Sequence, residues 1–105
     1  MAAEGNGQKQ EYHVDFAAIV AQQIKSAGRR SKQLGRLQQF IDALKVIERR
    51  LRTDPLSFGE FTSAPPPGNL IYHTGTVVPL SVIFAIDRAN AIVYVRKVVL
   101  SSAWE

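Results

Sequence analysis

The chain has 105 residues, of which 46% are hydrophobic and 21% are charged, and this composition predicts a single folded domain rather than a disordered chain. It contains no cysteine, which excludes disulfide bonds and thiolate metal sites, and its two histidines are too few for zinc, so we expect neither a metal nor another cofactor. The net charge of +4 is unevenly distributed, which is compatible with an anionic partner.

The first ten residues, MAAEGNGQKQ, contain no apolar run and predict a flexible N-terminal tail rather than a secretory signal. Residues 11–105 form the predicted domain. The longest apolar stretch, Val77 to Ile86, is about half the ~20 residues that a membrane-spanning helix needs. We therefore expect a cytoplasmic protein that does not enter a membrane.

A short strand and a helix are predicted at the start of this domain. Residues 11–16, EYHVDF, alternate polar and apolar side chains, as a half-buried strand does. Asp15 is placed to cap the helix that follows. Apolar residues recur at helical spacing from Phe16 to Ile24, and Gly28 is expected to end or loosen this helix.

A second helix is predicted from Ser31 onward. Its apolar positions form one stripe: Leu34, Leu37, Ile41, Leu44, Ile47 and Leu51. Three arginines near its end are stabilised by the negative end of the helix dipole, and Asp54-Pro55 ends the helix. Two consecutive amphipathic helices joined near Gly28 predict an antiparallel hairpin.

The positive charge is concentrated in these two helices. Residues 25–52 contain nine Lys or Arg against Asp42 and Glu48, which gives this segment a charge of +7 and a potential that attracts polyanions or acidic partners. The predicted RNA-binding residues along one side of the hairpin are Lys25, Arg29, Arg30, Lys32 and Arg36. The alternative is an ordinary solvated helix surface.

The second half of the sequence predicts strands. Residues 53–69 form a surface connection that contains the stiff segment APPPG. Strands are predicted over residues 70–74, 80–86 and 91–100, with residues 87–90 as a turn. We therefore predict an α+β fold of order β-α-α-β-β-β, in which a helical hairpin packs on one face of a mostly antiparallel four-stranded sheet and leaves the other face open.

The YHVDF strand, the two basic helices, the segment DPLSFGE and the hairpin PLSVIFAID…AIVYVRKV resemble the RelE/ParE toxin superfamily of type II toxin–antitoxin modules, also labelled plasmid stabilisation proteins. The resemblance covers Tyr12 to Leu100. It implies a cognate antitoxin that wraps around the toxin and neutralises it. RelE-type members cleave messenger RNA in the ribosomal A site, whereas ParE-type members inhibit DNA gyrase.

RelE-like chemistry implies an endoribonuclease that works without a metal, because cationic side chains on the open sheet face orient the ribose 2′-hydroxyl and stabilise the phosphate. The resemblance makes His73 and Arg96 the candidate catalytic residues and adds Lys97 to the RNA-binding residues. By strand alternation Arg96 and Lys97 point to opposite faces, with Arg96 on the side of Tyr94. The alternatives are a solvent-near histidine at a strand end and cations whose stems pack at a sheet edge.

The sequence departs from the nuclease pattern at several positions. Pro79-Leu80 and residues 100–102, LSS, stand where family nucleases carry basic residues, and Trp104-Glu105 stands where a tyrosine or histidine follows. A further basic position falls on Ile71. These departures favour two alternatives, a ParE-like inhibitor that binds gyrase or another macromolecule, and a non-toxic degenerate relative. A homodimer is a further alternative, and Trp104 is expected to take part in a contact either with the antitoxin or with a second copy of the chain.

Overall fold

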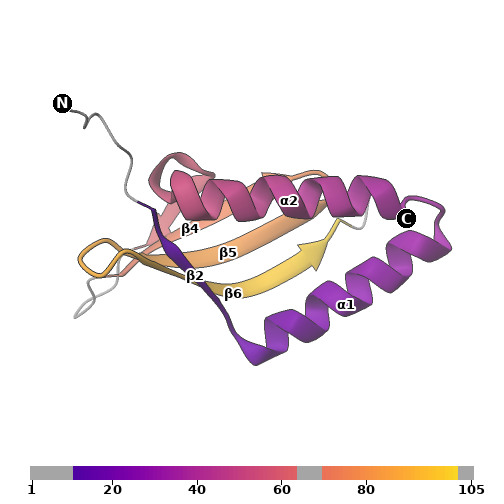
Figure 1. Cartoon of the computed structure of the whole chain (residues 1–105), viewed down its shortest axis with the longest axis horizontal. Coiled ribbons are helices and arrows are strands. Elements are labelled where there is room, and N and C mark those ends of the chain that lie inside the picture. Colours follow the sequence, from indigo (N-terminus) through magenta and orange to yellow (C-terminus); the bar gives the residue numbers. More distant parts are fainter. Residues whose placement is uncertain (1–10, 64–69, 102–105) are drawn as a thin grey trace.

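The computed structural model describes residues 11–63 and 70–101, so the predicted N-terminal tail, the proline segment and Trp104 lie outside the described residues. Figure 1 shows two helices in front of a curved sheet. The elements in chain order are β2 (His13–Phe16), α1 (Ala18–Gln33), α2 (Leu37–Thr53), the 3-10 turn η1 (Pro55–Ser57), β3 (Glu60–Ser63), β4 (Leu70–Val77), β5 (Leu80–Asp87) and β6 (Ile92–Leu100). No helix in this part of the chain is long and apolar enough to cross a membrane.

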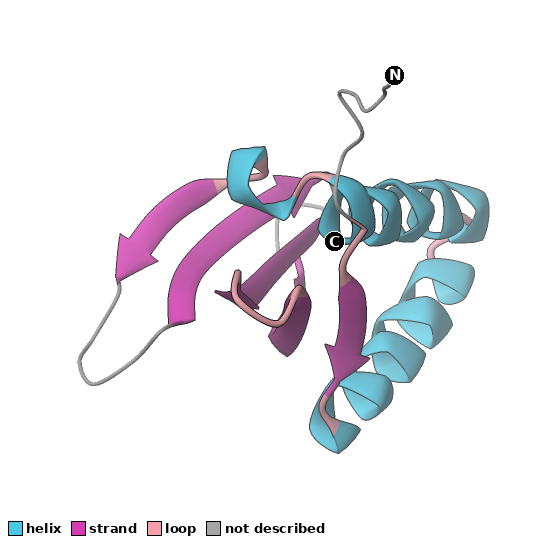
Figure 2. Cartoon of the chain, turned by 60° about the vertical axis from the view of Figure 1, so that its left-hand side comes forward, coloured by secondary structure: helices cyan, strands magenta, loops and turns pink. Residues whose placement is uncertain are grey.

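The sheet has five strands in the order β2-β6-β5-β4-β3, with β2 parallel to β6 and every other pair antiparallel. Both helices lie on one side of it (Figure 2). The predicted α+β fold and the helix-covered face are confirmed, but the prediction of four strands was wrong. The missed strand is β3, whose four residues, EFTS, are too few and too polar to give a clear alternating pattern.

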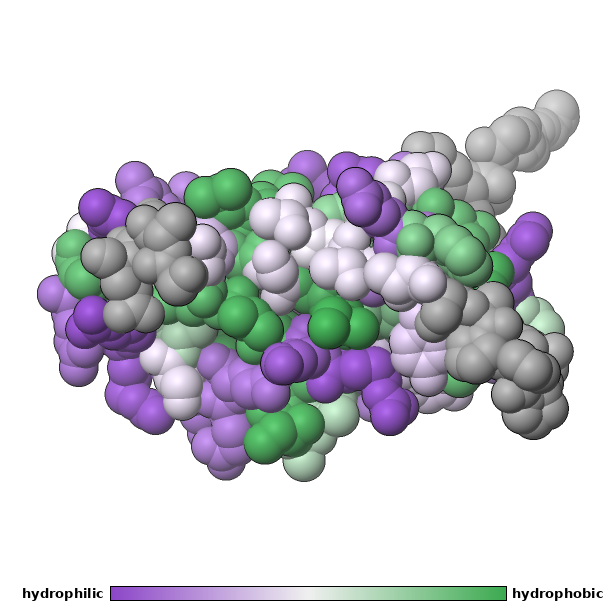
Figure 3. Space-filling view, turned by 180° about the vertical axis from the view of Figure 1, so that it is seen from behind, coloured by the Kyte–Doolittle hydropathy of each residue, from purple (hydrophilic) through white to green (hydrophobic). Residues whose placement is uncertain are grey.

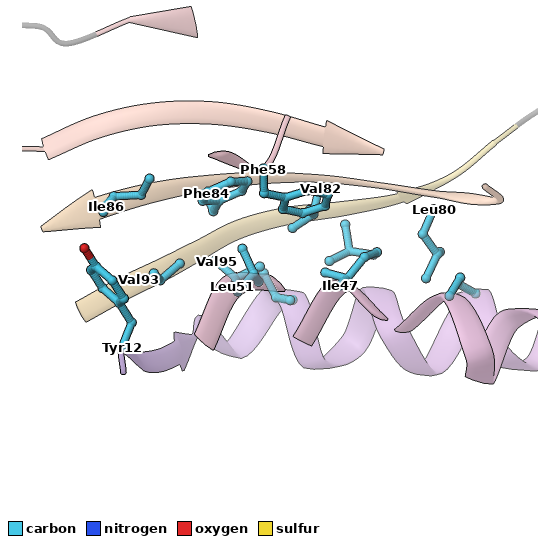
Figure 4. Packing of buried hydrophobic residues seen from close by; sticks show 14 of the residues in the cluster. Tyr12, Ile47, Leu51, Phe58, Leu80, Val82, Phe84, Ile86, Val93 and Val95 are labelled. Carbon is cyan, nitrogen blue, oxygen red and sulfur yellow. The ribbon is translucent and has the colours of Figure 1, made fainter. Parts of the chain in front are cut away.

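The core lies between the sheet and the helices (Figure 4). Alternate residues of β5, among them Val82, Phe84 and Ile86, face the helices and are almost completely buried. They pack with Ile47 and Leu51 of α2 in one hydrophobic cluster. The amphipathic stripe predicted for α2 therefore faces the sheet, as a helix that covers one side of a sheet requires.

The helical hairpin turns later than predicted. α1 continues through Gly28 to Gln33, and the turn is made at Gly35, whose φ of +72° favours glycine. A Cβ atom added at Gly28 would lie 3.2 Å from the ring of Phe40, so the missing side chain lets α1 approach α2. Phe40 takes a place in the core that the predicted stripe gave to Leu37, which is 37% exposed.

The start of α1 also differs from the prediction. Asp15 lies inside β2, and the residue before the helix is Ala17, without a side-chain cap. The backbone N–H of Ala17 instead donates to the carbonyl of Val95 in β6, at 3.4 Å. This bond ties the start of α1 to β6, and no side chain takes the capping role that was predicted for Asp15.

Two glycines let the segment after α2 close onto the sheet. Gly59 has a φ of +75°, and a side chain there would collide with the backbone of Thr74. A side chain at Gly75 would collide with the ring of Phe58. The ring of Phe58 consequently enters the core and stacks on Phe84, with 5.6 Å between centroids.

Candidate functional site

No helix of the described part of the chain covers the sheet face that turns away from α1 and α2. Figure 3 views the molecule from behind, where hydrophobic and near-neutral side chains fill the centre and hydrophilic ones lie along one side. The register of the strands places the side chains of this open face in rows that run across the sheet.

One row contains two tyrosines. Tyr94 of β6 pairs with Asp15 on one side and with Ala85 on the other, and Ala85 pairs in turn with Tyr72 of β4. Ala85 is completely buried, whereas both tyrosines are half-buried. Two aromatic rings thus lie two strands apart on the open face, separated by a small residue. Partly exposed rings of this kind can stack on the bases of single-stranded nucleic acid.

Of the next two rows, the first ends in a cation and the second is neutral. Lys97 pairs with Ile83, which pairs with Thr74. In the row beyond, Ser81 pairs with Val99 and with Thr76, and the hydroxyl oxygens of Ser81 and Thr76 are hydrogen-bonded at 3.1 Å. The open face therefore carries hydroxyl groups and positive charge.

A β-bulge in β6 changes the predicted direction of its cations. Phe84 pairs with Val95 and Ile83 pairs with Lys97, so Arg96 is an extra residue between them. Val95 and Val98 are both buried, whereas Arg96 and Lys97 between them are both exposed. The prediction that the two cations point to opposite faces was wrong, because alternation fails at the bulge. The sequence signal for the bulge is the pair of adjacent cations between Val95 and Val98, which interrupts the alternation of apolar and polar residues.

His73 lies on the other side of the sheet. It pairs with Phe84 on the helix-covered face, and only 6% of it is exposed. Its ring contacts Phe84, at 5.6 Å between centroids, and lies edge-on to Phe61, at 6.2 Å. The structure therefore does not bring His73 and Arg96 into one site, and this position does not fit proton transfer on the open face.

The contacts of His73 give it a structural role. Its Nδ1 lies 3.0 Å from the carbonyl oxygen of Phe58, so an Nδ1–H group donates to that carbonyl. The guanidinium of Arg50 lies 5.0 Å from the centroid of the Phe58 ring and donates to the carbonyl of Ser57 at 3.2 Å. His73 and Arg50 together hold the segment between α2 and β3 against the sheet.

The residues of the predicted basic patch do not all share one side of α1. Lys25, Arg29 and Lys32 lie opposite its buried side and are exposed, whereas Arg30 lies on another side of the helix and Arg36 lies in the turn before α2. α1 contains no acidic residue, whereas α2 pairs Arg52 with Glu48 at 3.0 Å. The structure thus places the helix cations on the helical layer and the cations of β6 on the sheet.

The positions where the sequence departs from the nuclease pattern have structural roles. Leu80 is completely buried in the core, so it cannot contact a substrate on the open face. The backbone N–H of Ser101 donates to the carbonyl of Pro79 at 2.7 Å, which ties the end of β6 to the start of β5. Within the described ranges, no three or more His, Cys, Asp or Glu side chains form a group that could hold a metal ion.

The turn between β5 and β6 contains an acid with a shifted pKa. A hydrogen bond from the side chain of Asn90, at 2.8 Å, lowers the pKa of Asp87 below its ordinary value of 3.8, and the backbone N–H of Asn90 adds a second bond at 3.1 Å. Asp87 is thus held as a carboxylate that closes the turn.

One comparison with solved structures bears on this fold. The chain is similar to a chain in the crystal structure of the archaeal RelE-RelB complex from Pyrococcus horikoshii OT3, with a TM-score of 0.55 and 14% sequence identity. The similarity covers 89% of this chain and 98% of that one. No family model matches the sequence, and no curated protein is significantly similar to it. The protein therefore has a RelE-like fold, and at this identity the likeness extends to the fold alone.

Proposed function

We propose that this protein is the toxin component of a type II toxin–antitoxin pair, that an antitoxin neutralises it, and that it acts on its target through the open face of the sheet. The RelE-like fold supports this class, and the similar Pyrococcus chain comes from a complex of RelE with RelB. The β-bulge is the observation that supports the open face as the functional surface, because it leaves Arg96 and Lys97 exposed together beside Tyr94.

The target that suits this surface best is ribosome-bound messenger RNA. Arg96 and Lys97 would neutralise phosphates, and Tyr72 and Tyr94 would stack on unpaired bases. Binding of this kind tolerates many base sequences, because every base offers an aromatic face and every nucleotide a phosphate. Occupation of the message on the ribosome would stop translation.

Cleavage of the message is the stricter form of this proposal. It requires one group that accepts the proton of the 2′-hydroxyl and another that protonates the leaving oxygen. Because His73 is buried on the helix side, these roles fall to groups of the open face. The amine of Lys97 would accept the proton of the 2′-hydroxyl, a tyrosine hydroxyl would protonate the leaving oxygen, and Arg96 would stabilise the phosphate.

A second candidate is a ParE-like inhibitor that binds gyrase or another protein. The observation that favours it is the neutral centre of the open face, where the strand register brings together Ile83, Val99, Thr74 and Thr76. Surfaces of mixed apolar and hydroxyl groups suit a protein partner at least as well as a nucleic acid.

A translating extract separates these candidates. Addition of the purified protein should stop translation, and primer extension would report cuts in ribosome-bound message if the open face cleaves RNA. Blocked translation with intact message would support binding alone. Normal translation together with cleaved supercoiled DNA in a gyrase reaction would support the second candidate. Neither effect, with no growth arrest on induction, would contradict a toxin function.

A further inference from the structure

A groove lies between α1 and the end of β6, on the edge of the sheet next to β2. It has a volume of about 480 Å³. Its walls include Ile19, Gln22 and Ser26 of α1 and Val98 and Val99 of β6. Ile19 is 59% exposed and Val99 is 43% exposed, so apolar surface is available at both walls. Figure 1 shows α1 running beside the arrowhead of β6.

The floor of this groove includes a free stretch of strand edge. β2 pairs with β6 only from Ile92 to Val95, and among the described strands none pairs with this edge beyond Val95. Residues two apart in a strand direct their backbone groups the same way. The backbone of Val98 and of Leu100 therefore faces the groove.

Gln23 accepts the hydrogen bond of the first of these backbone groups, the N–H of Val98. The N–H of Val98 donates to Oε1 of Gln23 at 2.7 Å, in a partly buried bond between residues far apart in sequence. A side-chain amide oxygen here has the chemistry and the distance of the carbonyl that a neighbouring strand would supply. Gln23 thus gives the N–H of Val98 the hydrogen-bond acceptor that an added strand would supply.

The charged side chain that lines the groove is cationic. It belongs to Arg30 of α1, and neither α1 nor β6 contains an acidic residue. A segment laid beside β6 would have one side against Ile19 and the other side next to Lys97. Apolar residues suit the first side and carboxylates suit the second.

We propose that this groove binds an extended peptide segment with alternating apolar and acidic residues from a partner protein, which adds as a strand to the edge of β6 and displaces Gln23. Backbone hydrogen bonds to Val98 and Leu100 would give affinity, and the cations would select acidic sequences. A nucleic acid has no peptide groups to continue the sheet, so it fits this edge less well. This inference concerns a surface other than the open face and does not depend on toxin activity.

The test begins with a displayed library of random linear dodecapeptides, selected against the full chain. Enriched peptides should alternate apolar and acidic residues, and their synthetic versions should bind in fluorescence anisotropy. Hydrogen exchange should slow at the amides of Val98 and Leu100 in the complex. No enriched peptide, enrichment without acidic residues, or unchanged exchange at these two amides would overturn the proposal.

Variants of Gln23 give the sharpest readout. Gln23→Ala removes the competing acceptor and should tighten peptide binding about three- to tenfold, the equivalent of one ordinary intramolecular hydrogen bond. Gln23→Glu keeps the acceptor and adds a repelling charge, so it should weaken binding. Gln39→Ala on the exposed side of α2 is the matched control and should change nothing. Equal affinity of all three variants would place the peptide elsewhere.

A blocking variant completes the test. Ile19→Lys places a long cation in the groove at a position that is largely exposed, so the fold should survive, as circular dichroism would check. The peptide should lose at least tenfold in affinity for this variant because the apolar wall is lost and the groove is filled. Wild-type affinity would contradict binding in the groove.

Discussion

The two faces of the sheet carry different kinds of side chain. On the covered face β5 presents residues that are almost completely buried, and His73 of β4 lies among aromatic rings beside them. On the open face the rows contain tyrosines, hydroxyl groups and the cations of the bulge. Polar and ionisable side chains therefore occur on both faces, but His73 on the covered face is buried, whereas Arg96 and Lys97 on the open face are exposed.

Phe84 and Ile83 are adjacent residues of β5 that test the covered face against the open face. Phe84→Ala should lower the free energy of unfolding by about 3–5 kcal/mol, because its buried ring contacts Phe58 and His73. Ile83→Ala on the open face should cost only about 1 kcal/mol, because Ile83 is half-buried. Urea denaturation measures both. Equal losses would mean that the two faces do not differ in their contribution to stability.

His73 tests whether an imidazole on the covered face is structural. His73→Ala should cost about 2–3 kcal/mol in urea denaturation, because the carbonyl of Phe58 loses its donor and a cavity remains. Inhibition of translation per folded molecule should not change. The matched change Thr74→Ala, one residue further and on the open face, should have little effect on stability. Intact stability with lost inhibition in His73→Ala would instead support the catalytic role predicted from the sequence.

Arg96 and Lys97 test the open face. The double change to Gln should leave stability within about 0.5 kcal/mol, since both side chains are exposed. Binding of single-stranded RNA should weaken about tenfold, and the slope of log K against log salt should fall by about 1.4, the value for two lost phosphate contacts. The control pair, Lys45→Gln with Arg49→Gln on α2, should leave RNA binding unchanged. A loss shared by the control would indicate general charge attraction.

Replacement of Asp87 in the turn between β5 and β6 should have the smallest effect on stability. Because its pKa is lowered in the folded protein, its contribution to stability is present above 3.8 and is lost as the pH falls through the lower folded value. Asp87→Ala should therefore lower the urea midpoint slightly at neutral pH, and the difference from wild type should vanish in acid. A difference that persists at the lowest pH would show that the Asn90 bonds do not depend on the carboxylate charge.

The sequence predicted the parts of the fold that burial determines. The alternation of LSVIFAID and the stripe that ends in Ile47 and Leu51 follow directly from the need to bury one face, so strand β5 and helix α2 were found. The hairpin turn was misplaced because Gly28 was interpreted as a helix end. The glycine is needed for close packing against Phe40, and that contact is not visible in the local pattern.

The site was harder to predict than the fold. Arg96 and Lys97 were found as candidates, but their common exposure depends on a bulge, which alternation assumes to be absent. The prediction that His73 is catalytic did not include its burial. The residues that cover it, Phe58 and Phe61, come from a segment that was predicted to be a surface connection. The bond between Gln23 and Val98 joins segments that no local pattern relates.

The pairing of β2 with β6 joins the first described strand of the chain to the last. During synthesis β2 leaves the ribosome long before β6 exists, so the sheet remains incomplete until the final strand emerges. Long-range pairing of this kind also slows folding. A nascent chain therefore does not present the complete rows of the open face until β6 has been made, because each row takes side chains from β4, β5 and β6.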